Sequence, residues 1–187
     1  MHCVPRTYIG GLASLMFLGF AVSSLIMPYT GDLYGRLNSA QLLGVLTLPI
    51  WYLVISTDSF AVIQFACFWA GLLSLLRFTN LFILMSELVQ EKHLGNATSI
   101  FMSGDSFMGF YLVGYLCYID KDIVAVQHVS IYLTLLSLVL FAFIPESPKW
   151  LISVGRYDEA RRSLKSIAKM NGCSSAELDM PFKEEIY

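Results

Sequence analysis

Five long runs of apolar residues divide the chain, and short polar stretches separate them. The runs cover residues 8–27, 37–57, 60–86, 97–119 and 123–144. About twenty apolar residues are needed to cross roughly 30 Å of hydrocarbon as a helix, and each run is long enough. Since backbone amides cannot stay unpaired in lipid, we expect a transmembrane helix in each run. The first run exceeds the apolar core of a signal peptide, so we expect it to be a retained span.

A different pattern begins after the last apolar run. Ser147 before Pro148 is typical of an N-cap followed by proline at the first helical position, and Gly155 is typical of a left-handed helix end. The residues that follow place apolar side chains on one helical stripe and charged side chains on another. We therefore expect a transmembrane bundle over residues 1–146 and a cytoplasmic helical segment over residues 147–187.

The composition supports a membrane protein and excludes several other classes. With 56% apolar and 14% charged residues among 187, the chain does not resemble a soluble domain. A net charge of −2 without a basic face argues against nucleic-acid binding. The four cysteines form no C-x-x-C pair, which argues against a zinc site or a disulfide framework. No catalytic or nucleotide-binding motif occurs, so we expect no enzyme activity, no metal and no cofactor.

The lysines and arginines predict the orientation. Most of the twelve lie on one side of the membrane if the C-terminal segment is cytoplasmic, whereas Arg6 and Lys121 lie on the other and Arg77 lies within a span. The positive-inside rule then places the N-terminus outside and the C-terminus in the cytoplasm. Lys149 and Trp150 follow the last span, where we expect the ammonium in water and the indole in the headgroup layer.

Two motifs after the last span resemble a known family. The segment P-E-S-P-K-W-L, Pro145 to Leu151, is followed by G-R-Y-D-E-A, Gly155 to Ala160. Together they resemble the stretch after the sixth membrane helix in the major facilitator superfamily, in its sugar-porter and organic-cation-transporter branches. The resemblance implies an all-α polytopic bundle whose five spans are the second to sixth helices of an N-terminal half. The chain would then be a fragment of a carrier whose other helices are missing.

Two loops extend the resemblance. Residues 28–37 resemble the loop between the second and third helices of the superfamily, and residues 86–95 resemble the loop between the fourth and fifth. Leu33 stands where the family has a basic residue, and Arg36 is the arginine that remains to pair with the family's glutamates. The resemblance implies a conformational latch formed by Asp32, Gly35, Arg36, Glu87 and Glu146.

Arg77 and Asp105 are charged residues inside the predicted spans. Placing a charge at mid-bilayer costs at least a few kcal/mol, so a charged residue there is expected to have an oppositely charged partner or a functional role. Each lies about fourteen residues from the middle of the connecting loop, so antiparallel helices would place both at the same depth. Three interpretations stay open: an ion pair that stabilises the hairpin, a role in binding substrate or a proton, and a placement that faces lipid.

The surroundings of Asp105 predict a substrate site. In the fifth helix of the family's members, polar residues near this depth face the substrate. A carboxylate at this depth can attract an organic cation or carry a proton. Aromatic rings can bind a cation through their faces, but each ring could instead serve only to pack the helices. Our candidates for a site that binds the solute or a coupling proton or sodium ion are Arg77, Asp105, Ser103, Trp69 and Phe101.

These observations predict a function in membrane transport. We expect the movement of a small organic solute, a sugar or an organic ion, by alternating access. The partners would be the lipid bilayer, the solute, and the missing helices of the same carrier. The alternatives are a truncated membrane protein that does not transport and a packing or regulatory partner of another membrane protein.

Overall fold

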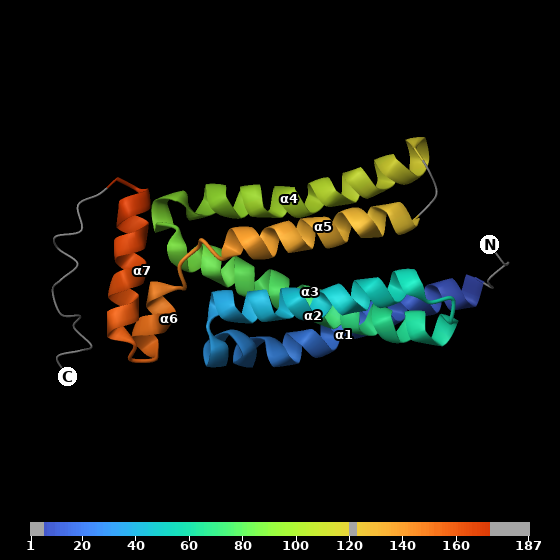
Figure 1. Cartoon of the computed structure of the whole chain (residues 1–187), viewed down its shortest axis with the longest axis horizontal. Helices are drawn as coiled ribbons and strands as arrows, with labels where there is room; N and C mark the ends of the chain where they lie inside the picture. The colour runs from blue at the N-terminus through green and yellow to red at the C-terminus, as the bar shows by residue number, and fades with distance from the viewer. Residues whose placement is uncertain (1–5, 120–122, 173–187) are drawn as a thin grey trace.

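The protein is an all-α helical bundle (Figure 1). The computed structural model describes residues 6–119 and 123–172, so the predictions for residues 120–122 and 173–187 lie outside the described part. Within it, five helices are long and apolar enough to cross a membrane, which confirms the predicted fold class. The helices are α1 (Arg6–Tyr34), α2 (Arg36–Ser56), α3 (Phe60–Leu88), α4 (Glu91–Tyr118), α5 (Ile123–Phe141), α6 (Pro148–Ser153) and α7 (Tyr157–Met170).

The helix boundaries differ from the expectation where helices extend beyond the apolar runs. The stretch expected to be a loop before the second span belongs to α1 as far as Tyr34, and only Gly35 separates α1 from α2. Gly35 has a φ of 95°, which favours glycine. In the same way α4 begins at Glu91, before the apolar run at residues 97–119, whereas α5 ends at Phe141, three residues before the end of its apolar run. Polar turns continue a helix in water without an apolar signal, so hydrophobicity alone misplaces these ends.

The centre of the bundle lies where α1, α2 and α3 pack together. Leu43 of α2 meets Leu72, Leu73 and Leu76 of α3 in a buried apolar cluster. Small residues let the helices approach closely, because a Cβ on Gly19 of α1 would collide with the backbone of α3. These three helices therefore form a compact unit with its own core.

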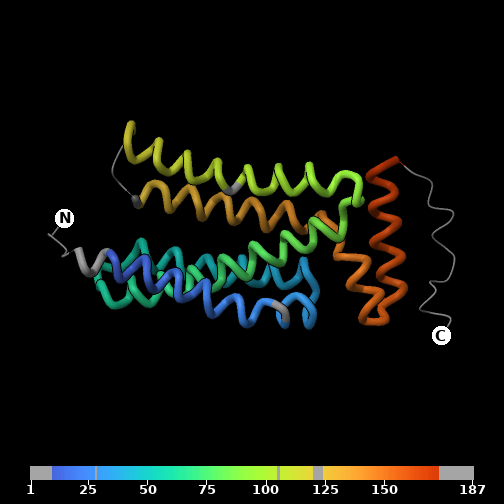
Figure 2. The backbone as a smooth tube through the Cα atoms, turned by 180° about the vertical axis from the view of Figure 1, so that it is seen from behind, coloured from blue at the N-terminus to red at the C-terminus, as the bar shows by residue number. Residues whose placement is uncertain are grey.

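The helices α4 and α5 lie along the side of this unit (Figure 2). No described side chain of α4 is buried. The Phe101 ring contacts Phe78 and Phe82 of α3, with ring centroids 5.1 and 5.7 Å apart. The helix α5 packs mainly against α2. The second part of the bundle is thus attached through few side chains.

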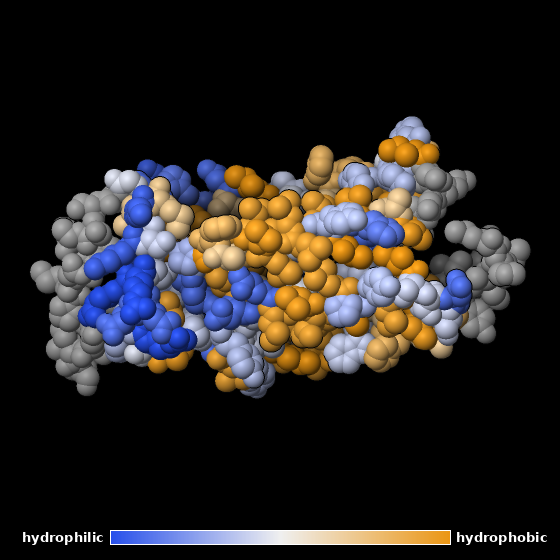
Figure 3. Space-filling model, in the orientation of Figure 1, coloured by the Kyte–Doolittle hydropathy of each residue, from blue (hydrophilic) through white to orange (hydrophobic). Residues whose placement is uncertain are grey.

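At one end of the bundle, α6 and α7 lie across the spans (Figure 1). The hydroxyl of Ser147 accepts a hydrogen bond from the Trp150 amide, and Gly155 has a φ of 78°, which confirms the N-cap and the left-handed end. Trp150 is buried against Leu151 and Ala160, so its indole packs inside the protein, and its depth at the headgroup layer stays a prediction. The amphipathic helix α7 is confirmed, and polar surface gathers at this end (Figure 3).

Candidate functional site

The five residues of the predicted latch, which we call the end cluster, lie at the α6 end of the bundle. Asp32, Arg36 and Glu87 come from three different helices. Arg36 Nη1 donates a hydrogen bond of 2.5 Å to Asp32 Oδ1, and Arg36 Nε lies 3.6 Å from Glu87 Oε1. The side chains of Arg36 and Glu87 are largely buried, whereas that of Asp32 is 65% exposed. Arg36 therefore links α1, α2 and α3, and the Asp32 carboxylate faces the solvent.

Glu146 joins the end cluster in a different way. Its Oε1 accepts hydrogen bonds from the amides of Leu37 and Ser147 at 2.9 and 3.0 Å, and its Oε2 accepts one from Asn38 at 3.2 Å. The first turn of α2 has no cap from its own N-cap residue, Gly35, and a carboxylate is stabilised at a helix N-terminus. The carboxylate thus binds backbone amides, where the resemblance implied a bridge to an arginine.

Gly35 makes this cap possible. A Cβ on Gly35 would lie within 3.1 Å of the Trp150 ring and closer still to a Glu146 carboxylate oxygen. A larger residue would therefore push Glu146 away from the start of α2, besides being strained at a φ of 95°.

Two further hydrogen bonds tie α6 and α7 to the end cluster. Trp150 Nε1 donates to the Asp32 carbonyl at 2.9 Å, and Ser163 Oγ donates to the Glu146 carbonyl at 2.6 Å. Neither contact was predicted from the sequence. Ser163 lies three residues after Ala160, on the same buried face of α7. The helical period alone therefore predicts that Ser163 is buried.

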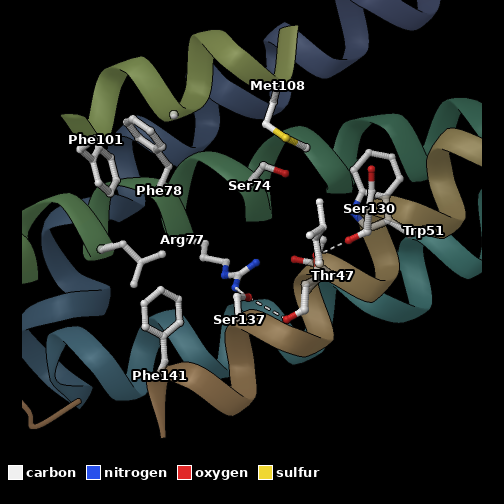
Figure 4. Close-up of a pocket in the computed structure, with 14 residues that line it drawn as sticks. Thr47, Trp51, Ser74, Arg77, Phe78, Phe101, Met108, Ser130, Ser137 and Phe141 are labelled. Atoms are coloured by element: carbon white, nitrogen blue, oxygen red, sulfur yellow. Dashed lines mark hydrogen bonds between the residues drawn. The ribbon is translucent and has the colours of Figure 1, made fainter. Parts of the chain in front are cut away.

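A second site is a cavity of about 840 Å³ between α2, α3, α4 and α5, which we call the lateral groove (Figure 4). Apolar side chains dominate its walls, among them Trp51, Phe78 and Met108. Arg77 enters it from α3, and its Nη2 donates a hydrogen bond of 2.6 Å to Ser137 Oγ of α5. The groove therefore holds one cationic group in mostly apolar surroundings.

Hydroxyl groups line the α5 side of the groove. Ser130, Thr134 and Ser137 share one face of α5, and each donates to a backbone carbonyl of its own helix at 2.7–3.1 Å. Since each hydroxyl proton is used in this way, the oxygens can act only as acceptors toward the groove, and Ser137 Oγ already accepts from Arg77. This row was not predicted from the sequence, although its spacing of four and three residues is that of one helical face.

A model of the family described as sugar (and other) transporters matches residues 3–186, which is nearly the whole chain. The chain belongs to this transporter family. The resemblance found in the motifs to the sugar-porter and organic-cation-transporter branches of the major facilitator superfamily is thereby confirmed.

Among curated proteins, the chain is similar to human organic cation/carnitine transporter 2, with 29% identity over 168 residues that cover 85% of this chain and 28% of the human protein. It is 24% identical to rat solute carrier family 22 member 3 over 163 residues, which cover 85% of this chain and 29% of that protein. A segment of 42 residues is 48% identical to organic cation transporter 1 of Caenorhabditis elegans and covers 22% of this chain and 7% of that protein. The chain therefore spans less than a third of the length of these relatives.

The predicted substrate residues of this family member do not all lie together. Arg77 and Phe101 line the lateral groove. Trp69 lies outside the groove lining, with its ring against Phe65 and Phe68. Ser103 is exposed on α4 and donates to the backbone of its own helix. The backbone of Asp105 belongs to α4, but its side chain lies outside the described part, so its pairing with Arg77 stays a prediction.

Proposed function

We propose that this chain forms part of a membrane carrier that moves a small organic solute by alternating access. The family match over residues 3–186 carries the proposal, together with five helices able to span a membrane. The names of similar proteins point to organic cations and to carnitine. Because the chain spans less than a third of the length of these relatives, the carrier would be completed by further helices.

The end cluster takes the role of a latch in this proposal. Alternating access requires contacts at one end of a bundle that form in one state and break in the other. The Arg36 ion pairs and the Glu146 cap join α1, α2, α3 and α6 at one end, and the exposed Asp32 carboxylate is available to a neighbouring helix. This arrangement supports a latch that holds the α6 end together while the opposite end is open.

We assign the α6 end to the cytoplasm and the segment from residue 147 onward to a cytoplasmic unit, following the distribution of basic residues. A tag placed after Tyr187 should bind antibody only after the cells are permeabilised. Binding to intact cells would contradict this orientation. A tag at the N-terminus is the matched control and should bind antibody in intact cells.

The solute remains a choice between an organic ion and a sugar, with a proton or sodium ion as the candidate coupling ion. Asp105, Ser103, Trp69, Phe101 and Arg77 are the residues we propose for this site. Carnitine and a quaternary ammonium cation are the first solutes to test, because the similar proteins are named for such compounds.

A chimera provides the functional test. The matching segment of human organic cation/carnitine transporter 2 is replaced by this chain, and uptake of labelled carnitine and of a quaternary ammonium cation is measured. We expect uptake above background, and a strong reduction when Arg36→Ala removes both ion pairs. Arg156→Ala is the control, because it removes only an exposed pair with Glu159 on α7.

Two results would contradict the proposal. A chimera that reaches the cell surface but transports neither solute, while the parent does, would favour a membrane protein that does not transport. Vesicles that contain this chain alone should show no uptake, and uptake there would contradict the need for further helices.

A further inference from the structure

A hollow of about 300 Å³, which we call the α7 hollow, lies between α7 and the chain that follows the last span. Arg162 and Ser166 of α7 belong to its lining, and so do Pro145 and Glu146. The helix α5 ends at Phe141, and the four residues from there to Pro145 reach at most about 14 Å. The α7 hollow therefore lies close to the headgroup layer at this end of the spans.

Two polar side chains of α7 bring unused hydrogen-bond donors to the α7 hollow. Arg162 and Ser166 are four residues apart, so they share one face of the helix. Neither side chain makes a hydrogen bond or an ion pair with another residue of the described part. A guanidinium carries five N–H donors and a serine hydroxyl carries one, and such a set suits the oxygens of a phosphate group. The hollow can therefore hold an anion.

The two carboxylates in the lining are bound to other groups. Glu146 accepts hydrogen bonds from the three backbone amides described above. Glu159 Oε1 accepts from Nε and Nη2 of Arg156, at 2.9 and 2.6 Å. These donors offset the negative charge of both glutamates. The Arg162 guanidinium is thus the charged group of the lining that lacks a partner among the described residues.

The charge of the surrounding segment also favours an anion. Residues 147–172 carry six basic and two acidic side chains. Both acidic ones, Asp158 and Glu159, form ion pairs within this segment. The helix α7 lies across the spans, at the end of the bundle where polar surface gathers (Figures 1 and 3). A basic cluster on an amphipathic helix beside a span is typical of a surface that binds anionic lipids.

We propose that the α7 hollow binds the phosphate of an anionic phospholipid from the adjacent leaflet, with Arg162 and Ser166 as donors. In the orientation proposed above this is the cytoplasmic leaflet, which is the one that carries anionic lipids. A free phosphate ion has the same oxygens, but a lipid is already concentrated at this depth by the membrane itself. The bound lipid would hold α7 against the bilayer beside α5. Lipid binding of this kind does not depend on transport activity.

Native mass spectrometry of the full chain, released from detergent micelles, measures the lipid that stays bound. The probes are phosphatidic acid, which ends in an anionic phosphate, and phosphatidylcholine with the same acyl chains, in which choline covers the phosphate. We expect the chain to bind phosphatidic acid about fivefold more tightly, which corresponds to about 1 kcal/mol. Arg162→Met should remove most of this preference, and Ser166→Ala should remove a smaller part.

Lys169→Met is the matched control, because Lys169 is an exposed cation of α7 that lies outside the lining. It should lower the preference less than Arg162→Met does. An equal loss in these two variants would overturn the proposal, since the attraction would then come from the charge of α7 as a whole. Equal binding of the two lipids by the unmodified chain would also overturn it.

A competition experiment separates the lipid from a soluble ligand. Millimolar inorganic phosphate, added to the complex with phosphatidic acid, should leave the lipid bound. Displacement of the lipid would assign the α7 hollow to a soluble phosphate compound and would overturn the proposal. If Arg162→Met does not fold, the two lipids on the unmodified chain and on Ser166→Ala decide the outcome, and an unchanged preference in Ser166→Ala would contradict the assigned donors.

Discussion

The unit of α1, α2 and α3 and the pair of α4 and α5 are built from similar apolar sequences but pack very differently. In the first, Gly19 and Gly71 lie against the backbone of the facing helix, and larger side chains would collide there. In the second, Gly104, Gly109 and Gly114 of α4 have no described neighbour at the position of a Cβ. Among the described residues, the glycines of the first unit therefore allow two helices to pack closely, whereas those of α4 face no neighbouring helix.

The polar groups show the same contrast. Asn80 is buried between α1 and α3 and donates to the Leu76 carbonyl and to Thr30 Oγ1, at 2.9 and 3.3 Å. Arg77, three residues earlier on α3, faces the groove and keeps a buried Nε without a described acceptor. One helix thus has a satisfied polar side chain on the face toward α1 and an unsatisfied one on the face toward α4 and α5.

Glycine substitutions should produce the largest difference between the two regions. Gly71→Leu should destabilise the folded protein by about 3 kcal/mol or more, because the side chain must displace the α1 backbone at Met16. Gly109→Leu should change the free energy of unfolding by about 0.5 kcal/mol or less. Unfolding in mixed detergent micelles, followed by circular dichroism, measures both. Equal losses in the two variants would remove the contrast between the regions.

The cap on α2 should have the next largest effect. Glu146→Ala leaves the Leu37 and Asn38 amides without their acceptor and should cost about 2 kcal/mol, measured by the same unfolding assay. Glu146→Gln keeps one acceptor oxygen and should cost less. The control is Glu159→Ala, which removes an exposed ion pair within α7 and should cost about 0.5 kcal/mol or less. A loss in Glu146→Ala no larger than in this control would show that the cap is unimportant.

The predicted Arg77–Asp105 pair can be measured by a double-mutant cycle. Arg77→Ala and Asp105→Ala should each destabilise the protein, and the double variant should lose about 1–2 kcal/mol less than the sum of the two. The control cycle pairs Arg77→Ala with Ser103→Ala, which lies outside the groove lining, and should be additive. An additive result for Arg77 and Asp105 would refute their pairing.

The smallest effect concerns the tie between α6 and α1. Trp150→Phe keeps an aromatic ring in the buried cluster but removes the hydrogen bond to the Asp32 carbonyl, which should cost roughly 0.5–1 kcal/mol. Trp69→Phe, at a more exposed ring on α3, is the matched control and should be close to neutral. If the two substitutions destabilise the protein equally, the hydrogen bond of Trp150 does not stabilise this end of the bundle.

Much of the architecture was predictable from local pattern. The five spans and α7 follow from the length and period of apolar residues, and the Ser147 cap and the Gly155 turn follow from residue type. The ends of α1 and α4 were misplaced, since their outer turns are polar and the hydrophobic signal stops before the helix does. Trp150 was expected at the headgroup layer because its position after a span is typical of a boundary residue, and the structure adds that α7 packs against it.

By itself, the sequence determined the number of spans, the amphipathic helix and the family, because each depends on spacing and residue type within a short stretch. Only the tertiary structure decided which side chains meet. Glu146 accepts a hydrogen bond from the amide of Leu37, 109 residues earlier, and Arg77 of α3 donates to Ser137 of α5. The periodicity of a helix tells which residues share a face, but which helix that face touches depends on how all the helices pack.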